Sequence, residues 1–305
     1  MTGRTKASPR TVPVLARLTR LRLSLAVTAA ALAGLLLEHP RPGWTAGLAL
    51  SLGVWTLAAG ASALNQLQER DIDALMRRTR GRPLPAGQLR PRTALMIAAG
   101  LSAGGLALLG FGGAEPVLFG LVALLCYNGL YTPLKRRTPL ALLPGALCGA
   151  IPVLIGWSFG GGSPADFRIL LVAALLYLWQ LPHFWRLADK NAADYRHAGL
   201  PLLRDRMAEP QAGLVRAAWT LALAVVALLL PLFGLLTTTF GCGVLLGVVL
   251  ILVGSALGPL RPRRPAAALS RAVPAWPDVC LLLLMLLLLG ERLLVAPGTD
   301  LLARI

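Results

Sequence analysis

The chain has 305 residues, of which 56% are hydrophobic and only 14% are charged. Soluble domains carry about 25% charged residues, so this composition excludes an ordinary soluble fold. Several continuous apolar runs reach the roughly 20 residues that a helix needs to cross a bilayer. Because these runs do not alternate between apolar and polar residues, they also exclude a β-barrel.

The formal net charge is +17, and the basic residues fall between the apolar runs. This distribution favours a positive-inside membrane topology and contact with anionic lipid over nucleic-acid binding. It also leaves room for some of these residues to bind an anionic substrate. Four cysteines lie inside apolar runs without metal-ligand spacing, and we interpret them as small core residues. They are Cys126, Cys148, Cys242 and Cys280.

Nine candidate membrane spans follow from the apolar runs, and they predict an all-α polytopic membrane protein. They cover about 21–37, 44–66, 92–110, 116–131, 139–157, 167–184, 214–236, 240–257 and 277–295. The segments after the even-numbered spans are rich in Lys and Arg, which places them and the N-terminus in the cytoplasm. An odd number of spans then places the C-terminus outside.

The same pattern divides the chain into a basic cytoplasmic segment at 1–20, a membrane domain at 21–295 and a short external tail at 296–305. The first apolar run also resembles a signal peptide, but its removal would disturb this topology. The Pro- and Arg-rich segment 261–277 is interpreted as a solvated loop.

The stretch "NQLQERDIDALMRRTRGRPLPAG", residues 65–87, follows the second span and gathers charges of both signs. If the helix continues, Asn65, Glu69 and Asp73 lie on one face, while Asp71 points elsewhere. Carboxylate and amide oxygens suit Mg²⁺, and the arginines that follow suit a diphosphate. The alternative is an amphipathic extension in which the acids pair with nearby arginines.

Two further polar segments follow the fourth and the sixth predicted spans, on the same side of the membrane as the first. "YTPLKRRTP" places Tyr131 four residues before Lys135, and "LWQLPHFWRLADKNAADYRHAGLPLL" places His183 among aromatic residues, ahead of Asp189 and Asp194. These residues predict a second acidic site that faces the first, next to an acceptor pocket. The alternative is an interfacial belt of aromatic residues with basic topology signals.

These segments, together with "GAIPVLIGW" at 149–157, occur in the order and spacing of the UbiA superfamily of intramembrane prenyltransferases, which the chain resembles. More narrowly, they resemble its protoheme-farnesylating branch. The resemblance implies a nine-helix bundle with a central cavity open to the cytoplasmic side, in the (inner) cell membrane. It also implies Mg²⁺-dependent transfer of a farnesyl group from farnesyl diphosphate to heme b.

The resemblance assigns a role to each motif residue. The metal ligands would be Asn65, Glu69, Asp73 and Asp194. The diphosphate would be bound by Arg78, Arg80, Lys135 and Arg136. The catalytic residues would be Asp73, Tyr131, Lys135 and Asp194, and the acceptor pocket would be lined by Trp179, His183 and Phe184. As protein partners, the resemblance suggests terminal oxidases or the proteins of heme A synthesis.

The chain departs from the family pattern in three places. Glu69 stands where the family has Asp, "LTRLRLSL" replaces a Lys-Pro-Arg cluster before the first span, and Val153 follows Pro152 where a second proline is expected. The alternatives are a family member that prenylates a quinone precursor or another aromatic acceptor, a transporter for an anionic lipid or metabolite, and an inactive assembly factor. A transporter would be expected to break its helices near mid-membrane, whereas these charges lie at span ends.

Overall fold

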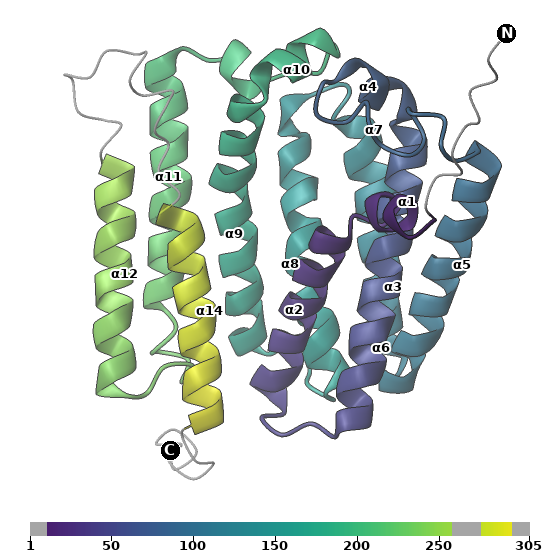
Figure 1. The fold of residues 1–305 in the computed structure, drawn as a ribbon. Coiled ribbons are helices and arrows are strands. Elements are labelled where there is room, and N and C mark those ends of the chain that lie inside the picture. Colours follow the sequence, from purple (N-terminus) through teal and green to yellow (C-terminus); the bar gives the residue numbers. More distant parts are fainter. Residues whose placement is uncertain (1–10, 258–275, 295–305) are drawn as a thin grey trace, which may run out of the picture.

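The computed structural model describes residues 11–257 and 276–294 (Figure 1). Every regular element in these ranges is helical and none is a strand, which confirms the predicted all-α fold. The long helices are α2 (Leu21–Glu38), α3 (Trp44–Gln68), α5 (Pro91–Leu109), α6 (Ala114–Leu124), α8 (Leu142–Phe159), α9 (Phe167–Lys190), α11 (Glu209–Leu228), α12 (Thr239–Leu257) and α14 (Trp276–Leu294). The short ones are α1 (Thr11–Leu18), α4 (Arg70–Leu75), α7 (Thr132–Leu134) and α10 (Ala192–His197).

Eight helices among the described residues are long and apolar enough to cross a membrane. They match the first eight predicted spans in order. The ninth prediction coincides with α14, which is 19 residues long but carries Asp278, Glu291 and Arg292. The all-helical membrane fold is therefore confirmed, whereas the count of nine spans is not.

The seventh span differs from its prediction, because α11 begins at Glu209 and ends at Leu228 rather than covering 214–236. Leu230 and Leu236 are buried, so the apolar run continues although the helix has ended. Pro231 disfavours helical backbone at the residue before it, and Gly234 has a φ of +69°. The apolar pattern after Leu228 therefore indicates that these residues are buried, not that they are helical.

Helix α8 is shared by two apolar clusters that make up most of the core. One cluster joins it to α9, α11, α12 and α14 around Trp157, Leu175 and Leu252. The other joins it to α2, α3 and α5 around Leu35 and Leu109. Many other large apolar side chains are exposed, among them Leu48, Met96 and Leu250, as expected for a surface in contact with lipid tails.

Two glycines let α2 and α8 approach closely. A Cβ atom added at Gly156 would overlap the backbone carbonyl of Ala31, and one added at Gly34 would overlap that of Val153. Small residues at such crossings allow backbone contact between membrane helices. This contact fixes α2 and α8 side by side in one wall of the bundle, and both helices face its interior.

The long helices stand side by side, and the short helices α4, α7 and α10 lie together at one end of the bundle (Figure 1). All three arise from the predicted polar segments that follow the second, fourth and sixth spans. The predictions for residues 1–10, for most of the loop at 261–277 and for the tail at 296–305 concern segments outside the described residues.

The α2–α8 contact predicts a specific sensitivity to one methyl group. Gly156→Ala should lower the free energy of unfolding by about 1–3 kcal/mol, because the added Cβ meets backbone that cannot turn aside. The measurement is thermal unfolding of the purified protein in detergent. Gly100→Ala is the matched control, since Gly100 lies in α5 with open space around it. Equal destabilisation by both changes would contradict this packing.

Candidate active site

A cavity of about 890 Å³ lies inside the bundle and is lined by residues of α2, α3, α8 and α9, with the segments 76–82 and 195–203 at its polar end. Its lining changes in character along α3. Val54 and Leu57 contribute apolar walls, whereas Ser62, Asn65 and Glu69 contribute polar ones. One cavity therefore combines an apolar region with a polar end.

The acidic face at the end of α3 is buried. The helix ends at Gln68, but the backbone amide of Glu69 still donates to Asn65 (3.0 Å) and that of Asp73 to Glu69 (2.8 Å). Helical spacing thus persists across the break into α4. Asn65, Glu69 and Asp73 are each at most 1% exposed, and all three line the cavity.

Each of these three side chains is held by a cation from another part of the chain. Glu69 Oε1 lies 2.5 Å from Lys135 Nζ, and Asp73 Oδ2 lies 2.6 Å from Arg82 Nη1. Arg20 donates from Nη2 to Asn65 Oδ1, at 2.8 Å. These contacts bring α2, α3, α4 and the residues after α7 to one place.

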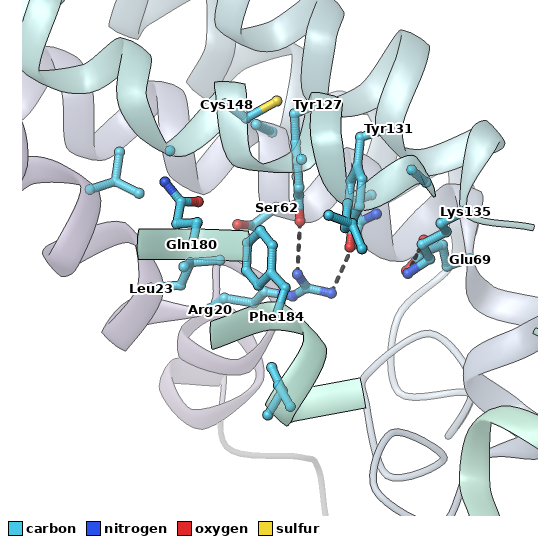
Figure 2. A pocket seen from close by; sticks show the side chains of 18 of the residues that line it. Arg20, Leu23, Ser62, Glu69, Tyr127, Tyr131, Lys135, Cys148, Gln180 and Phe184 are labelled. Carbon is cyan, nitrogen blue, oxygen red and sulfur yellow. Dashed lines mark hydrogen bonds and ion pairs between the residues drawn. The ribbon is translucent and has the colours of Figure 1, made fainter. Parts of the chain in front are cut away.

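Arg20 is placed by an uncommon backbone conformation. It separates α1 from α2 with φ 48° and ψ 54°, in the left-handed region, which costs an L-residue about 1–2 kcal/mol. Its Nη1 donates to the Tyr127 hydroxyl at 2.8 Å. Figure 2 shows its guanidinium below this hydroxyl and beside Phe184, with the Lys135–Glu69 pair farther to the right. The strained turn directs this guanidinium into the cavity.

The ring of Tyr131 also faces the cavity, from a π-helical stretch at Leu125–Tyr131. Thr132 caps this stretch by donating its hydroxyl to the carbonyl of Tyr127, five residues earlier (2.8 Å). Tyr127 and Tyr131 stack with ring centroids 5.7 Å apart. π-Helical turns often occur at functional sites, and this one directs two tyrosines inward from consecutive turns.

Positive charge exceeds negative charge around the cavity. Among the described lining residues, Glu69 and Asp73 are the carboxylates, and the cations are Arg17, Arg20, Arg22, Arg78, Arg82 and Lys135. Burial lowers the pKa of Lys135, against the opposing effect of Glu69. Burial likewise lowers the pKa of Arg82, and repulsion from Arg20 adds to this shift. Such a surface attracts a polyanion, which would relieve the repulsion among these cations.

Asp71 points away from the cavity. Its side chain is 63% exposed and receives two hydrogen bonds from Arg136, at 2.8 and 2.9 Å. This hydrogen bonding lowers the pKa of Asp71 below its ordinary value. Arg136, predicted to bind diphosphate, is therefore paired on the outside of the site and does not line the cavity.

The other predicted residues divide into two groups. Arg78, Tyr131, Lys135, His183 and Phe184 line the cavity, whereas Arg80, Asp194 and Trp179 do not. Asp194 accepts the backbone amide of Arg78 at 3.1 Å, and Trp179 donates to Asp278 at 3.0 Å. Asp189 lies 3.8 Å from Arg204 and 4.0 Å from Arg216. The chemical roles assigned to all of these residues stay predictions.

The sequence motifs assign no site role to Arg20 or Tyr127, and they include Arg82 only as one of the arginines that follow the acidic face. Tyr127 lies one helical turn before Tyr131, so its spacing was an available signal. Arg82 lies in a turn that the Thr79 hydroxyl stabilises by donating to the Asp73 carbonyl (3.0 Å). Arg20 belongs to the basic segment 1–20, and no sequence pattern indicates its left-handed backbone.

The residues present fit a magnesium ion. Asp73 Oδ1 is buried and makes no hydrogen bond, so it offers an oxygen ligand toward the cavity. No cluster of three or more His, Cys, Asp or Glu side chains suited to a metal occurs in the ranges that the structure describes. A bound ion would accordingly draw on few protein oxygens and on phosphate or water, which is the usual environment of Mg²⁺.

Comparison with known sequences identifies the family. A sequence model described as the UbiA prenyltransferase family matches residues 25–276. The chain belongs to this family. A protein named protoheme IX farnesyltransferase from Geobacter sulfurreducens is 44% identical over 267 residues, which cover 88% of this chain and 96% of the relative. One of the same name from Nitratidesulfovibrio vulgaris (strain DP4) is 39% identical over 289 residues, which cover 93% and 97%.

Solved structures share the UbiA fold. A digeranylgeranylglyceryl phosphate synthase superposes with a TM-score of 0.79 at 13% identity, covering 92% of this chain and 98% of the other. A UbiA homologue from Archaeoglobus fulgidus bound to GPP and Mg²⁺ gives 0.65 at 14% identity, covering 90% and 99%. With its apolar helices and its family membership, the chain is a multi-pass membrane protein.

Asp73 is buried and Asp71 is exposed, so removing the charge of each should lower the stability of the protein by different amounts. Asp73→Asn should lower the free energy of unfolding by about 3–5 kcal/mol, because it leaves Arg82 with a largely buried charge and no carboxylate. Asp71→Asn should cost less than about 1 kcal/mol, because its pair with Arg136 is solvent-exposed. Thermal unfolding of both variants in the same detergent tests this order, and an equal loss would contradict the burial difference.

Proposed function

We infer that this UbiA-family chain is a protoheme IX farnesyltransferase, which joins farnesyl diphosphate to heme b and releases diphosphate. The observation that carries this inference is one cavity with a cationic, carboxylate-containing end and an apolar remainder. That division matches a donor with a diphosphate head and an isoprenoid tail. The curated relatives of this name, aligned over nearly their whole length, supply the acceptor.

The polar end would bind the diphosphate. Lys135, Arg78 and Arg20 all line it, and each presents donors suited to phosphate oxygens. Asn65, Glu69 and Asp73 would hold Mg²⁺ together with the diphosphate, and Asp194 is proposed as a further ligand from the segment beside Arg78. When bound, Mg²⁺ supplies charge neutralisation of the leaving diphosphate.

Ion pairs stabilise the polar end of the cavity. Lys135 neutralises Glu69, and Arg82 neutralises Asp73. A diphosphate would recruit these cations, and its metal would take over the carboxylates. The buried charges are thus balanced before and after binding, which avoids the cost of an unpaired buried ion.

The apolar remainder would hold the farnesyl chain and limit water. The carbon–oxygen bond of the donor breaks with its electron pair on the diphosphate, and a vinyl carbon of heme b forms the new bond to the allylic carbon. This leaves a positive charge on the other carbon of the vinyl group, which water then attacks with release of a proton. Tyr131 would provide a π face in the cavity wall, and His183 and Phe184 would contact the acceptor.

The proposed location follows from charge. The short helices and their basic segments would face the cytoplasm of the (inner) cell membrane, with the polar end of the cavity on that side. Terminal oxidases or the proteins of heme A synthesis are the proposed partners, because a farnesylated heme needs a recipient.

A reaction with purified protein tests the acceptor. With Mg²⁺, farnesyl diphosphate and heme b, mass spectrometry of the extracted heme should show a farnesyl adduct. No adduct, together with prenylation of an aromatic acid, would assign the chain to another branch of its family. Binding of the donor without any product would favour a transporter or an inactive assembly factor.

Metal and carboxylate dependence provide a second prediction. Chelation of divalent cations should abolish diphosphate release, and added Mg²⁺ should restore it. Asp73→Asn should slow release by about 100-fold or more, since it removes charge stabilisation at the leaving group. Asp71→Asn is the matched control and should stay within about threefold. Similar losses in both variants would contradict the assignment of the buried face.

A further inference from the structure

A polar cluster joins α9 to α14 beside the cavity, outside the diphosphate end. Asp278, near the start of α14, receives hydrogen bonds from three side chains of α9. Its Oδ1 accepts from Trp179 Nε1 and contacts His183 Nδ1, both at 3.0 Å. Its Oδ2 is paired with the guanidinium of Arg186. Asp278 lies outside the sequence motifs of the family.

The cluster specifies which nitrogen of His183 carries the proton. A carboxylate oxygen can only accept a hydrogen bond, and so can an unprotonated ring nitrogen. Contact between Asp278 Oδ1 and His183 Nδ1 therefore requires the proton on Nδ1. The guanidinium of Arg186 lies beside the same pair, with its Nη2 3.3 Å from this nitrogen. The Asp278 carboxylate thus holds a proton of His183 on Nδ1.

The ring is also fixed in orientation. Its centroid lies 4.8 Å from that of Trp179 and 5.9 Å from that of Phe184, which meets it edge to face. His183 lines the cavity, and its Nε2 makes no hydrogen bond in the described part of the chain. Because Nδ1 is turned to Asp278, the Nε2 lone pair is the group left available to a molecule in the cavity.

We propose that Asp278 is a positioning residue that presents His183 Nε2 as an axial nitrogen ligand to the iron of the acceptor porphyrin. This inference rests on the proposed function, which supplies an iron porphyrin as substrate. Histidine that binds a metal commonly donates its other ring N–H to a carboxylate, which fixes the tautomer and raises ligand basicity. The iron would then be anchored at α9, at a site separate from the diphosphate end.

Comparison of two porphyrins tests the proposal. Asp278→Asn should weaken binding of heme b by about 10–100-fold, the usual effect of losing such a carboxylate. Binding of iron-free protoporphyrin IX should change less than about threefold, because it has no axial position to fill. Glu291→Gln is the matched control, since Glu291 lies on α14 and contacts Thr238 instead. It should alter neither affinity.

Spectroscopy supplies an independent measurement if Asp278→Asn proves unstable. Heme b bound to the unsubstituted protein should show the absorption spectrum of nitrogen-ligated iron. His183→Ala should lose this signature, and free imidazole should restore it. Equal weakening of both porphyrins in the Asp278 and His183 variants would reduce the cluster to a packing role and overturn the proposal, as would an unchanged spectrum in His183→Ala.

Failure of the inference is distinguishable from failure of the proposed function. If the unsubstituted protein neither binds nor farnesylates heme b, the acceptor assignment fails. If it does both while His183→Ala and Asp278→Asn leave iron-dependent affinity intact, the assignment stands and the positioning role is wrong.

Discussion

The site depends on the mutual neutralisation of buried charges at the end of α3. Glu69 and Asp73 lie almost wholly inside a membrane bundle, where an isolated carboxylate is prohibitively costly. Lys135 and Arg82 reach them from later parts of the chain, so four otherwise separate segments must converge for the fold to be stable. The same convergence assembles a pocket rich in cations, which is the property that a diphosphate requires.

The apolar architecture makes this convergence possible. Glycines at the α2–α8 crossing bring those helices into backbone contact, and α8 joins the two halves of the core. Side chains from α2, the π-helical stretch and α9 can then face a common interior. The strained backbone of Arg20 is tolerated in this setting, since its guanidinium gains partners in Asn65 and Tyr127.

Two groups of polar side chains lie at the cavity, in different parts of the bundle. The polar end with its carboxylates is built on α3 and α4, whereas the His183–Asp278 cluster is built on α9 and α14. In the proposed reaction, separate binding of the two substrates would matter, because the cationic intermediate must meet its acceptor before water does. Helices carry Asn65 and His183, whereas Arg78, Arg82 and Lys135 lie in the turns that follow α4 and α7.

Much of the site could be predicted from sequence. Helical spacing placed Asn65, Glu69 and Asp73 on one face and Asp71 on another, because this periodicity is a local property of the backbone. Arg136 could not be placed in this way. It is adjacent to Lys135 in the sequence, but it pairs with Asp71 outside the cavity that Lys135 lines. Partners such as Arg82 and Asp278 depend on chain reversals and helix contacts that no local pattern encodes.

By itself, the sequence determined the all-helical membrane fold, the order of its spans and the family, because apolar length and motif spacing are properties of consecutive residues. The tertiary structure decided which charges are paired, which tyrosines and arginines line the cavity, and that Asp278 holds His183. These are contacts between residues far apart in the chain, and their energies depend on burial, which exists only once the helices have packed.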